Sequence, residues 1–182
     1  MSVRSIKTYG PKQSGFVQKV VDINRVIPRI ESIEDLEKYE SDFTKEEYLA
    51  LYQSLFEKEV WEHSSWEERK VLAPLVDFFY DNNNCPVLVF PRFVPLATEQ
   101  EAFSIEDDDC FGELYGSLVL NGMEDEDIGS FIENIIKVCE EYDLNEEDIL
   151  YNLSNLGWNA TFGARIVDFG LNNEIMKWYS KE

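Results

Sequence analysis

Apolar side chains recur at helical spacing in three long stretches, each preceded by residues typical of a helix start. Thr44 with Glu47 forms a capping box ahead of the first, acidic residues open the second over residues 125–142, and Asn145 precedes the third. This spacing predicts three amphipathic helices, the third ending at Gly157. The expected core positions are Tyr48, Leu51, Tyr52, Leu55 and Phe56; then Ile128, Phe131, Ile132, Ile135, Val138 and Cys139; and finally Ile149, Leu150, Leu153 and Leu156.

Weaker signals predict further helical segments. Ser32 is a suitable N-cap for a short helix, and residues 174–179 have the pattern of a closing helical turn. Ser65 with Glu68 forms a second capping box, ahead of another apolar pattern. Pro74 lies inside that pattern and cannot donate a backbone hydrogen bond, so we expect a helix with a kink there.

Five short apolar runs are candidates for strands. Residues 86–90 form a continuous apolar run, typical of a strand that is covered on both faces. Residues 114–120 are a second candidate, which ends at a turn-forming Asn-Gly pair. Residues 164–169 predict a last strand, and residues 16–23 and 26–30 are candidates for edge strands.

Together these elements predict a helix-rich α+β fold with a small sheet and an acidic helical hairpin over residues 125–156. The length of 182 residues favours a single domain over residues 1–182. A chain of this size can bury about 70% of the surface that its unfolded form exposes.

The charge of the chain is unusual in its size and its distribution. The sequence has 37 acidic and 16 basic side chains, a net charge of −21. Residues 99–148 hold 18 of the acids and one base, Lys137, a net charge of −17. Such a concentration of one sign opposes folding. The chain is nevertheless 44% apolar and 14% aromatic, unlike a disordered acidic tail, so we expect the carboxylates to lie on a folded scaffold.

The first thirty residues have the opposite charge. They hold one acid and six bases, and we expect this basic N-terminal arm, residues 1–30, to pack on the acidic body through charge pairs. The alternative is an arm that binds nucleic-acid phosphates, but the acidic body would repel the same phosphates. The bases are Arg4, Lys7, Lys12, Lys19, Arg25 and Arg29.

No motif indicates catalysis, a metal or a cofactor. A calcium loop that starts at Asp107 has Phe111 and Leu118 where oxygen ligands are needed. The single histidine, His63, lies in a polar turn, and no glycine-rich phosphate loop is present. A carboxylate nuclease that uses Mg²⁺ stays an alternative, although no spacing singles out a set of ligands.

The acidic residues are better suited to binding a basic protein surface. The predicted helix after Asn145 has no base, so direct DNA binding through a helix-turn-helix is disfavoured. Carboxylates displayed on a rigid scaffold can occupy a channel that binds nucleic acid, and long-range attraction would speed the encounter. The candidate partner-binding residues are Glu106, Asp107, Asp108, Asp109, Glu124, Asp125, Glu126, Asp127, Glu140, Glu141, Asp143, Glu146, Glu147 and Asp148.

In its small size, aromatic-rich core, acidic block and lack of catalytic motifs, the chain resembles the acidic inhibitors encoded by phages and mobile elements. Among these it is most similar to the anti-CRISPR proteins directed at type II, single-effector RNA-guided nucleases. The resemblance implies a non-enzymatic inhibitor, without a cofactor, that binds the nuclease or its complex with guide RNA. It implies that guide loading, target binding or cleavage is blocked.

An immunity protein that neutralises a basic nuclease toxin is the alternative from another class. It would need the same carboxylates, with Trp61, Trp66 or Tyr115 as aromatic anchors. Three widely spaced cysteines, no secretion signal and no apolar run long enough to span a membrane favour a protein of the bacterial host cytoplasm.

Overall fold

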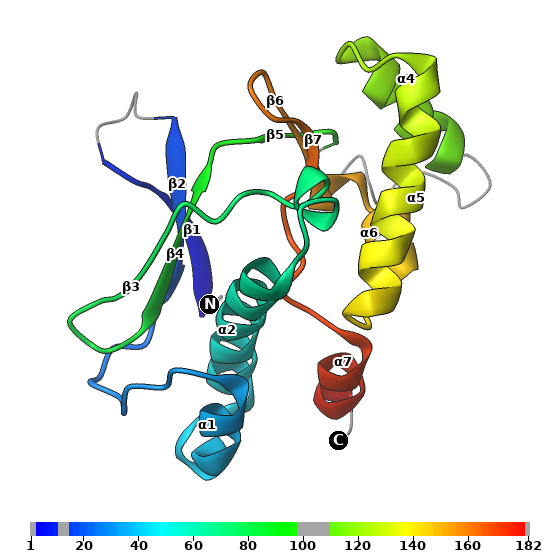
Figure 1. Ribbon diagram of the computed structural model, residues 1–182. Coiled ribbons are helices and arrows are strands. Elements are labelled where there is room, and N and C mark those ends of the chain that lie inside the picture. The colour runs from blue at the N-terminus through cyan, green and yellow to red at the C-terminus, as the bar shows by residue number, and fades with distance from the viewer. Residues whose placement is uncertain (1–2, 11–14, 98–109, 181–182) are drawn as a thin grey trace. The chain divides into compact units, whose positions relative to one another are not determined.

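The computed structural model describes residues 3–10, 15–97 and 110–180 (Figure 1). The α+β fold class is confirmed: helices combine with two small antiparallel sheets. The chain divides into two compact units, and the predicted single-domain organisation over residues 1–182 stays a prediction. Unit 1 consists of Met1–His63, Pro74–Arg92 and Glu174–Glu182, and unit 2 consists of Ser64–Ala73 and Phe93–Asn173.

Unit 1 is built on a four-stranded antiparallel sheet with the strand order β1-β2-β4-β3. Every residue of the inner strand β4 is buried, which confirms the covered strand predicted over residues 86–90. A strand does form within residues 16–23, but the prediction of an edge strand there is wrong, because β2 pairs with β1 on one side and with β4 on the other. The edge strand β1 was not indicated by the sequence pattern. The strands are β1 (Arg4–Thr8), β2 (Phe16–Val21), β3 (Asp77–Tyr80) and β4 (Pro86–Pro91).

The helix α2 (Lys45–His63) packs against β2 and β4 of this sheet. Its predicted capping box is confirmed: the Glu47 N–H donates to Thr44 Oγ1 at 3.2 Å, and the Thr44 N–H donates to the Glu47 carboxylate at 3.1 Å. All five predicted core positions of α2 are buried. Unit 1 also contains α1 (Ile33–Lys38), capped by Ser32, a 3-10 turn (Glu40–Asp42) and, apart from its first residue, α7 (Asn173–Ser180).

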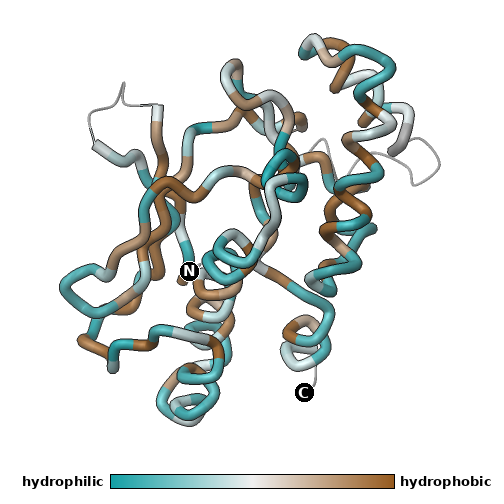
Figure 2. The backbone as a smooth tube through the Cα atoms, in the orientation of Figure 1, coloured by the Kyte–Doolittle hydropathy of each residue, from teal (hydrophilic) through white to brown (hydrophobic). Residues whose placement is uncertain are grey.

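In unit 2, the helices contribute fully buried apolar side chains, among them Leu114, Leu118 and Ile135. The hydropathy of the chain alternates along α5 (Figure 2), as expected for an amphipathic helix. Its predicted core positions are buried except Ile132, which is half-buried. The elements are α4 (Cys110–Leu120), α5 (Asp125–Glu141), α6 (Glu146–Tyr151), 3-10 turns at Glu68–Lys70 and Leu153–Asn155, and a sheet of β5 (Val94–Pro95), β6 (Leu156–Asn159) and β7 (Gly163–Ile166).

The strand predicted over residues 114–120 is wrong, because this segment belongs to helix α4. Leu114 and Leu118 are both fully buried. Residues four apart share one face of a helix, whereas a short apolar run by itself fits either structure. The four-residue spacing of Leu114 and Leu118 therefore indicated a helix correctly.

The kinked helix expected after Ser65 is also wrong. The Ser65 N–H donates to the Glu68 carboxylate at 2.5 Å, and the Glu68 N–H donates to Ser65 Oγ at 3.3 Å, so the capping box forms. Only a 3-10 turn follows, because the backbone groups beyond it pair elsewhere. Ile166 N–H donates to Val71 O at 2.7 Å, and Ala73 N–H donates to Ile166 O at 2.9 Å.

Two further boundaries differ from the prediction. The helix after Asn145 ends at Tyr151, and Gly157 lies in β6. A Cβ atom on Gly157 would lie 2.7 Å from Phe93 Cβ and 2.9 Å from a Val167 methyl carbon. The glycine is therefore required by close packing in the sheet and does not stop the helix. Residues 26–30, the second edge-strand candidate, form no strand.

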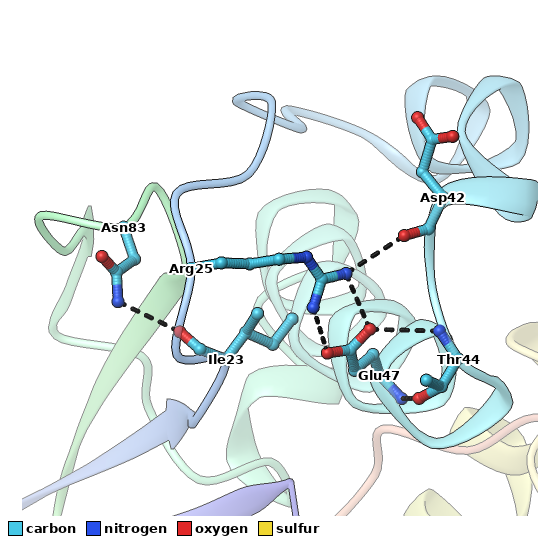
Figure 3. A network of polar contacts seen from close by, with 6 residues as sticks. All are labelled: Ile23, Arg25, Asp42, Thr44, Glu47 and Asn83. Carbon is cyan, nitrogen blue, oxygen red and sulfur yellow. Dashed lines mark hydrogen bonds and ion pairs between the residues drawn. The ribbon is translucent and has the colours of Figure 1, made fainter.

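The bases of the N-terminal segment belong to unit 1 and form ion pairs there. The Arg25 guanidinium donates hydrogen bonds to both carboxylate oxygens of Glu47, one of them at 2.8 Å (Figure 3). It also donates to the backbone oxygen of Asp42 at 3.0 Å. Lys12 lies outside the described residues, and packing of the arm on the acidic body stays a prediction. The other pairs are Arg4–Glu57 at 2.6 Å, Lys19–Glu57 at 2.5 Å, Lys7–Asp22 at 2.5 Å and Arg29–Glu31 at 2.9 Å.

Candidate functional site

The negative charge is concentrated in unit 2. This unit has 21 acidic and four basic side chains, a net charge of −17, whereas unit 1 has 16 acidic and 12 basic side chains, a net charge of −4. The candidate site is therefore a surface of unit 2. Two groups of carboxylates on α5 and α6 define it.

The first acidic group lies at the start of α5. Acidic side chains are favourable at this end because the helix dipole is positive there. A surface depression of about 400 Å³ adjoins the group, lined by Val119, Gly122 and Met123 together with three of its acids. The group consists of Glu124, Asp125, Glu126 and Asp127, all of them exposed.

The second acidic group lies where α5 ends and α6 begins. Asn145 caps α6 by accepting a hydrogen bond from the Asp148 N–H, as predicted. The 17 residues of α5 correspond to about 25 Å, so the two groups lie at opposite ends of a rod of that length. The second group consists of Glu140, Glu141, Asp143, Glu146, Glu147 and Asp148, all of them exposed.

None of these ten carboxylates forms an ion pair with a base in the described part of the chain. Lys137, on the exposed side of α5, forms none there either. Several acids of unit 1 differ, since Asp22, Glu47 and Glu57 are each paired with a base. A set of unpaired like charges leaves a strong local potential that a cationic partner can neutralise.

The second acidic group carries a local cost in stability. Glu140 and Glu141 lie in the last turn of α5, where the helix dipole is negative and opposes them. Asp143 follows with a left-handed backbone conformation, φ 52°, a position where glycine or asparagine is favoured. Its carboxylate accepts a hydrogen bond from Asn173 Nδ2 at 3.1 Å. Strain at exposed acidic residues is consistent with a surface selected for binding.

Two carboxylates have altered surroundings. Asp148 is exposed as a residue, yet its neighbours partly desolvate the carboxyl group and raise its pKa above the usual value, and the charge of Asp168 acts in the same direction. Asp125 accepts a hydrogen bond from the Tyr115 hydroxyl, which raises the pKa of that tyrosine. This second contact joins α4 to the first acidic group.

In the described part of the chain, neither a cluster of metal ligands nor an activated thiol is found. Within residues 3–10, 15–97 and 110–180, no three His, Cys, Asp or Glu side chains are placed to hold one metal ion. Burial raises the pKa of Cys139 to about 12 and that of Cys85 to about 11, which makes both thiols poor nucleophiles. His63 ends α2, and its Nδ1 lies 2.8 Å from Glu59 O.

The predicted site residues divide into three sets. Glu106, Asp107, Asp108 and Asp109 lie outside the described residues. The other ten are exposed and lie in the two acidic groups at the ends of α5. Of the proposed aromatic anchors, Trp66 and Tyr115 are exposed in unit 2, while Trp61 is half-buried in unit 1.

Sequence reasoning missed the apolar neighbours of the first acidic group. Val119 and Leu120 are exposed on α4, and Leu120 is 88% exposed. The wrong prediction of a strand over residues 114–120 is the reason that this exposed surface was not expected. The four-residue spacing of Leu114 and Leu118 would have indicated the surface, because in a helix with these two leucines buried, Val119 and Leu120 lie on the outer side.

The comparisons with known proteins give no family assignment. No protein-family model matches the chain, and no match was found among curated proteins or solved structures. In the described part of the chain, no helix is both long and apolar enough to cross a lipid bilayer.

Proposed function

We propose that this protein is a non-enzymatic inhibitor that binds the basic nucleic-acid-binding surface of a type II CRISPR nuclease in the bacterial cytoplasm. The observation that carries the proposal is the set of ten exposed carboxylates at the two ends of α5 and the start of α6, none of which forms an ion pair with a base within the described residues. A guide-loaded nuclease of this type holds its heteroduplex in a positively charged channel. The carboxylates would occupy part of that channel and block the guide or the target.

Charge complementarity supports a basic protein as the partner. The −17 charge of unit 2 attracts a cationic surface from a distance and repels the phosphates of free DNA or RNA. Attraction of this kind raises the association rate and weakens as salt is added. An RNA-guided nuclease is the proposed partner because the chain resembles the anti-CRISPR inhibitors in its small size, acidic block and aromatic content.

The test is a DNA cleavage assay with a purified type II nuclease, its guide RNA and increasing amounts of the protein. We expect excess protein to abolish cleavage. Addition before the guide, or between guide and target, identifies the step that is blocked. Full cleavage at a large excess of protein, in both orders of addition, contradicts the proposal.

Two variants of equal charge change locate the binding surface. Glu140→Gln/Glu141→Gln/Glu147→Gln removes three charges from the second acidic group and should raise the concentration needed for half-inhibition at least tenfold. The control, Glu34→Gln/Glu37→Gln/Glu46→Gln, removes three exposed charges from unit 1 and should inhibit like the unchanged protein. Equal inhibition by both variants would exclude the second acidic group from the interface.

The immunity-protein alternative uses the same acidic surface and gives a different result. An immunity protein would block a basic nuclease toxin and leave the RNA-guided nuclease active. A parallel assay with such a toxin domain therefore separates the two functions.

A further inference from the structure

Helix α4 has an exposed face that carries apolar side chains and one charged residue, Glu113. Tyr115, Val119 and Leu120 are 43%, 41% and 88% exposed. The helical repeat places Val119 and Leu120 on the side away from the buried Leu114 and Leu118, and Tyr115 at the edge of that side. Large apolar side chains gathered on one helix face commonly mark an interaction surface.

Two glycines make the same face unusually smooth. Gly112 and Gly116 are four residues apart, and a Cβ atom added to either would meet nothing within 4 Å. Packing inside the described chain therefore gives no reason for either glycine, although an interior glycine destabilises a helix by about 0.5–1 kcal/mol relative to alanine. Small residues at this spacing allow a second helix to approach closely.

The rim of this face is strongly acidic. The depression at the end of α4 is lined by Val119 and by Glu124, Asp125 and Glu126 of the first acidic group. Tyr115 is hydrogen-bonded to Asp125, so the apolar face and the carboxylates are joined. The combined surface offers apolar contacts on α4 and negative charges at one end.

We propose that the exposed face of α4 and the first acidic group bind a short amphipathic helix that is cationic. The occupant would place small or apolar side chains over Gly116, Val119 and Leu120, and Lys or Arg side chains against Glu124 and Glu126. The 11 residues of α4 span about 16 Å, enough for about three turns of the bound helix. The inference deepens the proposed function, because it names the element of the basic partner that is recognised.

The negative charge around this face favours a cationic helix over a second copy of the chain as the bound partner. A second copy of the chain would bring a further net charge of −21 to the interface and be repelled. A cationic helix instead gains from both halves of the surface.

The probes are two short peptides of Lys, Leu and Ala with the same composition. In the patterned peptide the leucines share one helical face, and in the scattered peptide they are distributed around the helix. Binding of each to the full-length protein is measured by fluorescence anisotropy at low and moderate salt. We expect the patterned peptide to bind about tenfold more tightly, since the energy of one buried apolar side chain corresponds to about a tenfold change in affinity.

Three variants test the two halves of the surface. Val119→Ser/Leu120→Ser should remove the preference for the patterned peptide and leave binding of the scattered peptide unchanged. Glu124→Gln/Glu126→Gln should weaken both peptides at low salt. Gly116→Ala should keep or raise the thermal midpoint while it weakens the patterned peptide, so a loss of binding cannot be attributed to unfolding.

Equal affinity of the unchanged protein for both peptides would overturn the inference, as would a preference that survives in Val119→Ser/Leu120→Ser. The nuclease assay separates this failure from failure of the proposed function. A patterned-peptide preference without inhibition of the nuclease keeps the docking face and rejects the nuclease as the target. Inhibition of the nuclease by a protein that shows no preference for the patterned peptide keeps the proposed function and rejects the docking face on α4.

Discussion

At the scale of single residues, the clearest structural charge is Glu57. Its side chain is fully buried in α2 and is held between Arg4 at 2.6 Å and Lys19 at 2.5 Å. Lys19 also lies over the ring of Phe90, 5.1 Å from its centroid. Two bases around one buried carboxylate link β1 and β2 to α2, so this acid serves the fold and is unavailable to a partner.

Glu57→Gln should destabilise the protein by about 3–5 kcal/mol, because it leaves two largely buried cations without their counter-charge. The matched control is Glu46→Gln in the exposed first turn of the same helix, which loses only its interaction with the helix dipole and should lower stability by less than about 1 kcal/mol. Urea unfolding followed by circular dichroism measures both. An unchanged midpoint for Glu57→Gln would show that the ion pairs contribute little.

Glu47 connects a helix cap to an ion pair. It closes the capping box with Thr44 and is held by the Arg25 guanidinium (Figure 3), which keeps the pKa of the Glu47 carboxyl below its usual value of 4.5. Because the folded state lowers this pKa, the pair stabilises the fold above the usual glutamate range. That contribution is lost as the pH falls through the lowered pKa.

Arg25→Met should return the pKa of Glu47 toward 4.5, as measured by NMR titration of its side chain. At pH 7 the free energy of unfolding of Arg25→Met should be lower than that of the unchanged protein by its largest amount. This difference should shrink as the pH falls below the glutamate range. A stability difference that stays constant from pH 7 to well below that range would contradict the ion-pair explanation.

At the scale of elements, α5 has favourable charges at one end and unfavourable charges at the other. Its first turn carries Asp125, Glu126 and Asp127, which interact favourably with the helix dipole. Its last turn carries Glu140 and Glu141 and no base. The acids of the first turn thus stabilise the helix, whereas those of the last turn do not, and the proposed function assigns them to partner binding.

Neutralisation at the two ends of α5 should therefore have opposite effects on stability. Glu140→Gln/Glu141→Gln should raise the free energy of unfolding by about 0.3–1 kcal/mol for each residue. Glu126→Gln/Asp127→Asn should lower it by a similar amount. Thermal unfolding at low salt measures both pairs, and a loss of stability on neutralising Glu140 and Glu141 would show that these acids are structural.

Elements with a repeated local signal could be predicted from the sequence. The capping boxes at Thr44 and Ser65 both form, and α2, β4 and α5 lie where their apolar patterns indicate. The segment after Ser65 could not be predicted locally, because its backbone pairs with β7, nearly a hundred residues further along the chain. Tertiary pairing of this kind overrides a local helical pattern.

At the scale of the whole molecule, the sequence predicted the acidic block but not how its charge relates to the two units. In unit 1 most of the described bases form ion pairs with acids of the same unit, while unit 2 exposes ten described carboxylates that form no ion pair with a base in the described part of the chain. Linear charge counts located the block, because 18 of its acids are close in sequence. The apolar face of α4 beside it depends on a helix that the pattern of residues 114–120 did not distinguish from a strand.

The most direct test of the account is the affinity of the protein for a guide-loaded type II nuclease as a function of salt concentration. We expect binding that weakens steeply as salt is added. The slope should be shallower for Glu140→Gln/Glu141→Gln/Glu147→Gln and unchanged for Glu34→Gln/Glu37→Gln/Glu46→Gln. Absence of binding at low salt, or one common slope for all three proteins, would contradict the claim that the carboxylates of unit 2 are a binding surface for a basic partner.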